Sequence, residues 1–393
     1  MLYNIHQQVF ALSMAANILG PITGTQSYLQ NYMEVNLPLT LSEFNVTGWK
    51  TIWGPVVWKN DTNNATTGAD NTWYVSNSPN LVFPDGKTYD TYVIAIAGTE
   101  GKFPTSFDWE VEDAGVSKVV DFKQFAASGM KVVPPPVTNP GIGAFIANGT
   151  AVGVSVLAVA SPPSSAVSPN IQLGDLITSL PSNAKVIFTG HSLAGALSPT
   201  LALGFQLAGT LKKFAPGNVL TYPTAGPTPG NGGFASLFAT YFPAIPGTAY
   251  QTWNTNTINK YDLVPQAWCT DATACPAQNM HNIVPMFSPA GLLKLELDLA
   301  LDAAMHTANQ SNITYIPLPS NAFAGPTPTH VTNRTEFYNE TMLQHVDAYF
   351  NYFNLPIPFK VATVHSPAFA ANPELGARTW GVLESIAKLL RRQ

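Results

Sequence analysis

Residues 185–207 read KVIFTGHSLAGALSPTLALGFQL, and this stretch decides the fold. The β-branched and aromatic run KVIFT at 185–189 predicts a buried strand. The small, apolar run 192–207 has no strong breaker except Pro199, so it predicts a packed helix that starts where the strand ends. A sharp strand-to-helix turn is therefore expected at 190–192.

Two further strands are predicted on either side of this stretch. TYVIAIA at 91–97 lies between Asp90 and Gly98, and residues 218–222 lead into a Gly/Pro-rich segment. Strand, helix and strand in this order describe a βαβ crossover, so the class is α/β with a largely parallel sheet.

The length of 393 residues allows one large domain or two smaller ones. Because its 33 Pro and 29 Gly are spread along the chain and form no single linker, we expect one domain over residues 1–393. Its core is expected at about 90–350, with an irregular insertion at 270–335. Apolar residues at helical spacing predict amphipathic helices at the N-terminus, from Leu2 to Leu19, and at 379–390.

The composition excludes several classes of protein. With 18 Lys+Arg, 23 Asp+Glu and a net charge of −5, the chain lacks the basic surplus of a nucleic-acid binder. A hydrophobic content of 46% excludes a disordered chain. The charge-free run 186–211 is long enough to span a membrane, but a buried strand and helix explain it better than a transmembrane segment. Metal and nucleotide motifs are absent from the sequence, so no metal and no cofactor is expected.

The predicted turn, Gly190-His191-Ser192-Leu193-Ala194-Gly195, has the pattern of a nucleophile elbow. In such a turn the serine has a strained backbone, and small residues must stand two positions away on each side. Gly190 and Ala194 meet this requirement. Ser192 is therefore the candidate nucleophile.

The elbow with its flanks, TGHSLAGA at 189–196, resembles the T-G-H-S-L-G-G-A of the fungal-type class 3 lipase family of α/β-hydrolases. Ala194 is the one departure, where the family has glycine. The resemblance spans about residues 90–350 and implies an α/β-hydrolase fold, with a central, mostly parallel sheet flanked by helices and with loop insertions. Further matches follow in the family's order: Ala97-Gly98-Thr99, Asp108-Trp109, and Gly226 to Asn231 with Phe234-Ala235.

A serine nucleophile needs a general base and an orienting carboxylate, which follow it in the order acid, then histidine. Asp262 in NKYDLVP is similar to the family's N-x-x-D-x-V-P, with Asp271 as the weaker alternative. His345 in QHVDAYF resembles the family's late histidine, with His281 next. The resemblance implies a triad of Ser192, Asp262 and His345.

The oxyanion of the tetrahedral intermediate needs hydrogen-bond donors. These are expected from Leu193, the residue after the nucleophile, and, by resemblance, from Thr99. The candidate substrate-binding residues are His191, Trp109 and Val264, and His191 is also expected to pack or hydrogen-bond beside the serine.

The family keeps a lid after this threonine, so residues 100–125 are a candidate amphipathic lid; a fixed loop is the alternative. The expected function is a triacylglycerol lipase that acts on an ester or lipid substrate, with an oil–water interface as the candidate place of action and with no obligate protein partner. A feruloyl-type or other soluble-ester esterase, a phospholipase, or a catalytically silent lipid-binding protein are the alternatives.

Cysteines and sequons indicate an extracellular protein. Cys269 and Cys275 close the short loop CTDATAC, which predicts a local disulfide, with two free thiols as the alternative. Together with the low charge, eight N-x-S/T sequons favour a secreted glycoprotein whose signal peptide has been removed. The sequons are Asn45, Asn60, Asn64, Asn148, Asn309, Asn312, Asn333 and Asn339.

Overall fold

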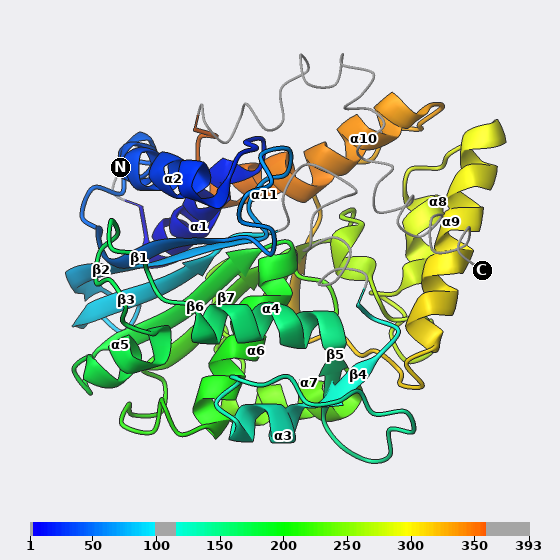
Figure 1. Ribbon diagram of the computed structural model, residues 1–393. Helices are drawn as coiled ribbons and strands as arrows, with labels where there is room; N and C mark the ends of the chain where they lie inside the picture. The colour runs from blue at the N-terminus through cyan, green and yellow to red at the C-terminus, as the bar shows by residue number, and fades with distance from the viewer. Residues whose placement is uncertain (1–2, 99–114, 359–393) are drawn as a thin grey trace.

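A central sheet organises the computed structural model, which describes residues 3–98 and 115–358 (Figure 1). Within these ranges the sheet has seven strands in the order β1-β2-β3-β6-β7-β8-β9. The pairs from β3 to β9 are parallel, whereas β1 and β2 extend the sheet in antiparallel fashion. The strands are β1 Lys50–Trp58, β2 Asn71–Val82, β3 Thr88–Ile96, β6 Lys185–His191, β7 Val219–Thr224, β8 Asn256–Asn259 and β9 Ser320–Phe323, with a separate pair formed by β4 Val119–Asp121 and β5 Phe145–Ala147.

Helices cover both faces of this sheet, as Figure 1 shows. The predicted fold class, a mostly parallel sheet flanked by helices, is confirmed, and the three predicted strands correspond to β3, β6 and β7. The helices are α1 Ile5–Ala15, α2 Gln26–Glu43, α3 Phe122–Ala127, α4 Asn148–Val159, α5 Leu173–Ser179, α6 Leu193–Leu207, α7 Gly232–Tyr241, α8 Ile283–Met286, α9 Gly291–Asn309, α10 Arg334–Met342 and α11 Ala348–Phe353.

Alternation along the strands divides the apolar residues between two layers. In β3, Val93 and Ala95 face the layer of α1, α2 and α11, whereas Ile94 and Ile96 face the layer of α4, α5 and α6. Successive side chains of a strand point to opposite faces, so a strand buried on both sides reads as one continuous apolar run. This explains why β3 and β6 could be recognised in the sequence.

The N-terminal part of the chain belongs to the core, which therefore begins well before the predicted residue 90. β1 and β2 are strands of the central sheet. The predicted amphipathic helix is α1, but it is buried almost all round, because it lies between the sheet and other helices and Phe10 stacks on Phe353 with 4.0 Å between ring centroids. Hydrophobic spacing alone did not show that its polar residues are buried as well.

The segment predicted as a lid divides into two parts. Residues 119–125 form β4 and the start of α3, and Val119, Phe122 and Phe125 are fully buried, so this end of the prediction is wrong. Residues 100–114, with Trp109, lie outside the described residues, as does the predicted helix 379–390. The predicted insertion contains α8 and α9, which pack with α10 around a separate apolar cluster.

The predicted disulfide is contradicted, because Cys269 and Cys275 are both buried free thiols. The Cys269 Sγ lies 3.4 Å from the Asp271 carbonyl oxygen, and the Cys275 Sγ lies 3.9 Å from that of Tyr315. Burial raises the pKa of Cys275 to about 12, so its thiol stays protonated.

The asparagines of the eight sequons are exposed or half-buried. Six of the asparagines are exposed, whereas Asn64 and Asn148 are half-buried. No helix in the described part of the chain is both long and apolar enough to cross a membrane.

Candidate active site

The turn between β6 and α6 places Ser192 in the backbone conformation expected of an elbow. Its φ is 63° and its ψ is −132°, a region that non-glycine residues rarely adopt and that costs about 1–3 kcal/mol. α6 begins at the next residue, Leu193, whose N–H belongs to the first helical turn, where amides have no intrahelical acceptor. The half-buried Ser192 thus lies at a helix N-terminus, next to the backbone N–H of Leu193, which has no intrahelical acceptor.

The elbow tolerates Ala194 because the facing residue is Gly190. A Cβ at position 190 would lie 2.5 Å from the Ala194 Cβ and 2.6 Å from its carbonyl oxygen. Position 190 can therefore carry no side chain, and its glycine leaves room for the methyl group of Ala194. The departure from the family pattern leaves the turn intact.

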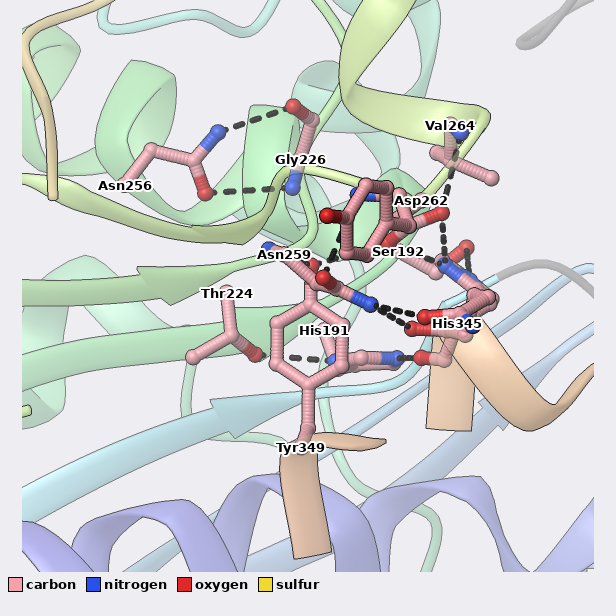
Figure 2. A network of polar contacts seen from close by, with 12 residues as sticks. His191, Ser192, Thr224, Gly226, Asn256, Asn259, Asp262, Val264, His345 and Tyr349 are labelled. Atoms are coloured by element: carbon pink, nitrogen blue, oxygen red, sulfur yellow. Dashed lines mark hydrogen bonds and ion pairs between the residues drawn. The ribbon is translucent and has the colours of Figure 1, made fainter. Parts of the chain in front are cut away.

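Ser192, His345 and Asp262 form a continuous chain of hydrogen bonds (Figure 2). The His345 Nε2 lies 2.9 Å from the Ser192 Oγ, and its Nδ1 lies 2.8 and 3.0 Å from the two carboxylate oxygens of Asp262. Asp262 is fully buried and follows β8, and His345 is only 9% exposed. The three residues come from points 70 and 83 positions apart in the sequence, and the sheet brings them together.

His345 is held through its backbone as well as through its ring. His345 lies in a π-helical turn, Leu343–Asp347, between α10 and α11. Its carbonyl oxygen accepts a hydrogen bond from the His191 Nε2 at 2.9 Å, and the His191 Nδ1 pairs with the Thr224 hydroxyl at 2.9 Å. This pairing places the proton of His191 on Nε2 and makes Nδ1 the acceptor of the Thr224 O–H.

Asp262 has two more donors besides the histidine. The Tyr349 hydroxyl donates to Oδ2 at 2.8 Å, and the Val264 N–H donates to Oδ1 at 3.0 Å. Burial, and then the charge of Asp262, raises the pKa of Tyr349 well above its usual value, so the hydroxyl keeps its proton at any working pH. Both oxygens of the carboxylate are thus satisfied without a cation.

The side-chain amides of Asn259 and Gln344 hold Asp262, His345 and Tyr349 in place. The Asn259 N–H donates to the Tyr349 hydroxyl at 2.9 Å, and its side-chain Nδ2 donates to the Gln344 backbone and side-chain oxygens at 2.9 and 2.7 Å. Gln344 in turn donates to Glu340 at 2.9 Å. Side chains therefore join the loop of Asp262 to the turn of His345.

The structure brings together most of the predicted site residues. At the carboxyl ends of β6 and β8 lie Ser192, His191, Asp262, His345 and Val264 (Figure 2), and Leu193 follows Ser192 as the first residue of α6. Thr99 and Trp109 lie outside the described residues. His191 is only 3% exposed and both its ring nitrogens are engaged, so the predicted substrate contact is wrong for it. The half-buried Val264 contributes a backbone N–H to the acid.

The alternative residues lie elsewhere. His281 is exposed and contacts the Thr270 carbonyl oxygen at 3.0 Å, and Asp271 accepts hydrogen bonds from the backbone of its own turn. Sequence reasoning missed Tyr349 and Asn259 as site residues, although both stand in the quoted motifs. The four-residue spacing between His345 and Tyr349 was the available signal, since residues four apart share a helix face.

Comparison with known proteins gives structural matches only. No protein-family model and no curated protein sequence matches this chain. M37 lipase is similar in structure, with a TM-score of 0.66 and 22% identity over 97% of this chain and 98% of that one. Lipase II from Rhizopus niveus has a TM-score of 0.36 and 17% identity over 66% and 74% of the two chains, and the lipase of Rhizopus microsporus var. chinensis has 0.34 and 18% over 63% and 71%. The likeness to M37 lipase shows a shared fold over nearly the whole length of both chains.

Proposed function

We propose that this protein is a serine carboxylic-ester hydrolase of the fungal-type class 3 lipase family, and that its substrates are triacylglycerols. The single observation that carries the proposal is the hydrogen-bonded series Ser192, His345, Asp262 on a nucleophile elbow. A strained serine at a helix N-terminus, in contact with an imidazole that contacts a buried carboxylate, is the arrangement that acyl transfer requires.

In the proposed mechanism, Ser192 attacks the ester carbonyl while His345 takes the proton from its hydroxyl. Asp262 holds the imidazole in the tautomer with the proton on Nδ1 and stabilises the imidazolium that forms. The imidazolium then protonates the leaving alcohol. A water molecule, deprotonated by the same imidazole, attacks the acyl-enzyme and releases the acid.

The oxyanion of the tetrahedral intermediate requires donors on the side of Ser192 away from the base. We propose the backbone N–H of Leu193 as one donor and Thr99 as the other. No metal ion and no organic cofactor is needed for these steps, and no protein partner is required.

The lipase activity is supported by the resemblance of the sequence motifs and by the fold shared with M37 lipase. A soluble-ester esterase and a phospholipase would use the same catalytic residues and differ in the substrate-covering segment.

We also propose that the protein is secreted and glycosylated, because six of its eight sequon asparagines are exposed. After expression in a glycosylating host, we expect glycosidase treatment to decrease the mass of the protein. An unchanged mass would contradict glycosylation.

The test of the function is the initial rate of tributyrin hydrolysis as its concentration crosses the solubility limit. We expect a rate that rises above this limit and that falls by at least about 10³-fold in Ser192→Ala. Ser198→Ala is the matched control, because this serine is buried within α6, the helix that follows Ser192, and its substitution is expected to leave the rate unchanged.

The outcomes separate the alternatives. A rate that saturates below the solubility limit would indicate a soluble-ester esterase, and a preference for phosphatidylcholine over tributyrin would indicate a phospholipase. The absence of turnover with all these esters, together with retained fatty-acid binding, would contradict the enzyme and favour a lipid-binding protein.

A further inference from the structure

Asn17 joins the N-terminal segment to the backbone next to the nucleophile. It lies in the short 3-10 turn Ala16–Leu19 after α1. Its side-chain Nδ2 donates to the Ser13 carbonyl oxygen at 2.9 Å, and its Oδ1 accepts the N–H of Gly98 at 2.8 Å. Both ends of the amide are used, so its orientation is fixed.

The hydrogen bond from Gly98 to Asn17 directly follows the last backbone hydrogen bond of β3. β3 ends at Ile96, and the next amide, that of Ala97, still donates to the Thr72 carbonyl oxygen of the neighbouring strand at 2.8 Å. The N–H of Gly98 has the Asn17 side chain as its acceptor instead. The amide side chain thus continues the pairing of β3 by one residue.

Gly98 packs directly against the elbow. A Cβ placed on it would lie 2.7 Å from the His191 carbonyl oxygen and 2.9 Å from the Ser192 Cβ. The same point is 3.4 Å from the Asn17 Oδ1. The backbone at 98 is therefore held between the nucleophile on one side and the asparagine on the other.

We infer that Asn17 is a positioning residue for ester hydrolysis, which holds the backbone at Gly98 against Ser192. This role rests on the function proposed above. The backbone at Gly98 must stay in place beside Ser192 as charge develops on the ester oxygen, because displacements of about 1 Å near the reacting atoms cost up to about 100-fold in rate. Because this charge is absent from the bound ester, loss of the asparagine affects kcat more than KM.

Two substitutions of Asn17 distinguish a positioning role from simple packing. Asn17→Ala removes both hydrogen bonds. Asn17→Asp keeps an acceptor for the Gly98 N–H but sets a carboxylate oxygen against the Ser13 carbonyl oxygen. Asn36→Ala is the matched control, since the Nδ2 of Asn36 donates to the Tyr32 carbonyl oxygen four residues earlier at 2.7 Å, on α2, which packs against β1.

The experiment measures kcat and KM of each variant with soluble 4-nitrophenyl butyrate, together with thermal unfolding. We expect kcat to fall about 10- to 100-fold in Asn17→Ala, with KM changed by less than about threefold, and Asn17→Asp to recover most of the lost rate. Asn36→Ala is expected to retain the wild-type kcat even where its unfolding temperature falls.

Two results would overturn the inference. One is a kcat of Asn17→Ala equal to that of the active wild-type protein. The other is a loss of rate in both Asn17 variants that is no larger than their loss of folded protein. A wild-type protein without turnover on this ester and on tributyrin would instead overturn the proposed function, and this role with it.

Discussion

The region around Asp262 and the region beneath helix α1 bury polar side chains in opposite ways. Around Asp262, the polar groups of Asn259, Gln344 and Tyr349 contact one another at 2.7–2.9 Å. Beneath α1, the ring of His6 lies between Trp253 and Tyr222, with centroids 4.2 and 5.4 Å away. Neither of its ring nitrogens has a hydrogen-bond partner among the described residues.

The difference reflects the different role of each region. Hydrogen bonds fix the direction of a group as well as its position, whereas packing against aromatic rings fixes only the volume that it fills. The Asp262 region holds the imidazole of His345 at a defined angle to Ser192. The α1 region supports the sheet from one side, and it tolerates a polar ring at the expense of about 1–3 kcal/mol for an unpaired buried group.

Asp262→Asn breaks the hydrogen-bonded region at its centre, and we expect the largest effect. The amide cannot accept from both the histidine and its other donors, so the imidazole loses the tautomer that acts as base. The expected result is a fall in kcat of about 10³- to 10⁴-fold, measured with tributyrin. Glu340→Gln is the control, because it makes the same chemical change further out in the same network, and we expect it to retain at least about a tenth of the wild-type rate. High activity in Asp262→Asn would show that the acid lies elsewhere, with Asp271 as the next residue to substitute.

His6→Leu tests the packed region through its pH dependence. Burial lowers the pKa of His6 to about 4, whereas the unfolded chain titrates near the usual value of 6.5. The unfolded state therefore binds the proton first as the pH falls, and this group destabilises the fold between pH 6.5 and pH 4 by about 3 kcal/mol. We expect the free energy of unfolding of His6→Leu, relative to wild type, to increase by that amount over this range in urea titrations. The control Ser13→Ala changes a buried, non-titrating residue of the same helix, and an equally large pH-dependent difference in it would refute the assignment to His6.

Tyr349→Phe makes the smallest change, because it removes one hydroxyl from the network and leaves the ring. The carboxylate of Asp262 then loses one of its donors, and the Asn259 N–H loses its acceptor. We expect kcat to fall about 5- to 30-fold, from one charge-assisted hydrogen bond and one unpaired amide. Tyr352→Phe is the control, since this ring stacks on Phe323 nearby. Equal rates in the two variants would mean that packing alone holds the acid.

The comparison also explains which parts of the site were predictable. The elbow at 190–195 is a constraint on consecutive residues, because a strained serine needs small neighbours on the chain itself. Asp262 and His345 were predicted through short motifs of the same kind. The supporting role of Asn259 depends on Tyr349 and Gln344, which are 90 and 85 positions away, so no local pattern records it.

The errors have the same physical origin. Helical spacing identified α1 but not its burial on almost every side, since burial depends on what packs against a helix. The family resemblance placed a candidate lid at 100–125, but residues 119–125 form β4 and the start of α3, which are buried in the core. The spacing of Cys269 and Cys275 allowed a disulfide, whereas in the folded chain both are buried free thiols that contact backbone carbonyl oxygens.

The sequence by itself determined the α/β class, the strand at 91–97, the βαβ unit at 185–222 and the strand-to-helix turn at Ser192, and it predicted the order of nucleophile, acid and base. These follow from periodicity and from backbone conformations that only certain neighbouring residues permit. Only the tertiary structure decided that the N-terminal segment completes the sheet and reaches Gly98 through Asn17, and that side chains of α10 and α11 hold the acid and the base together. Such contacts join residues far apart in the chain, and their geometry exists only once the sheet has brought the segments together.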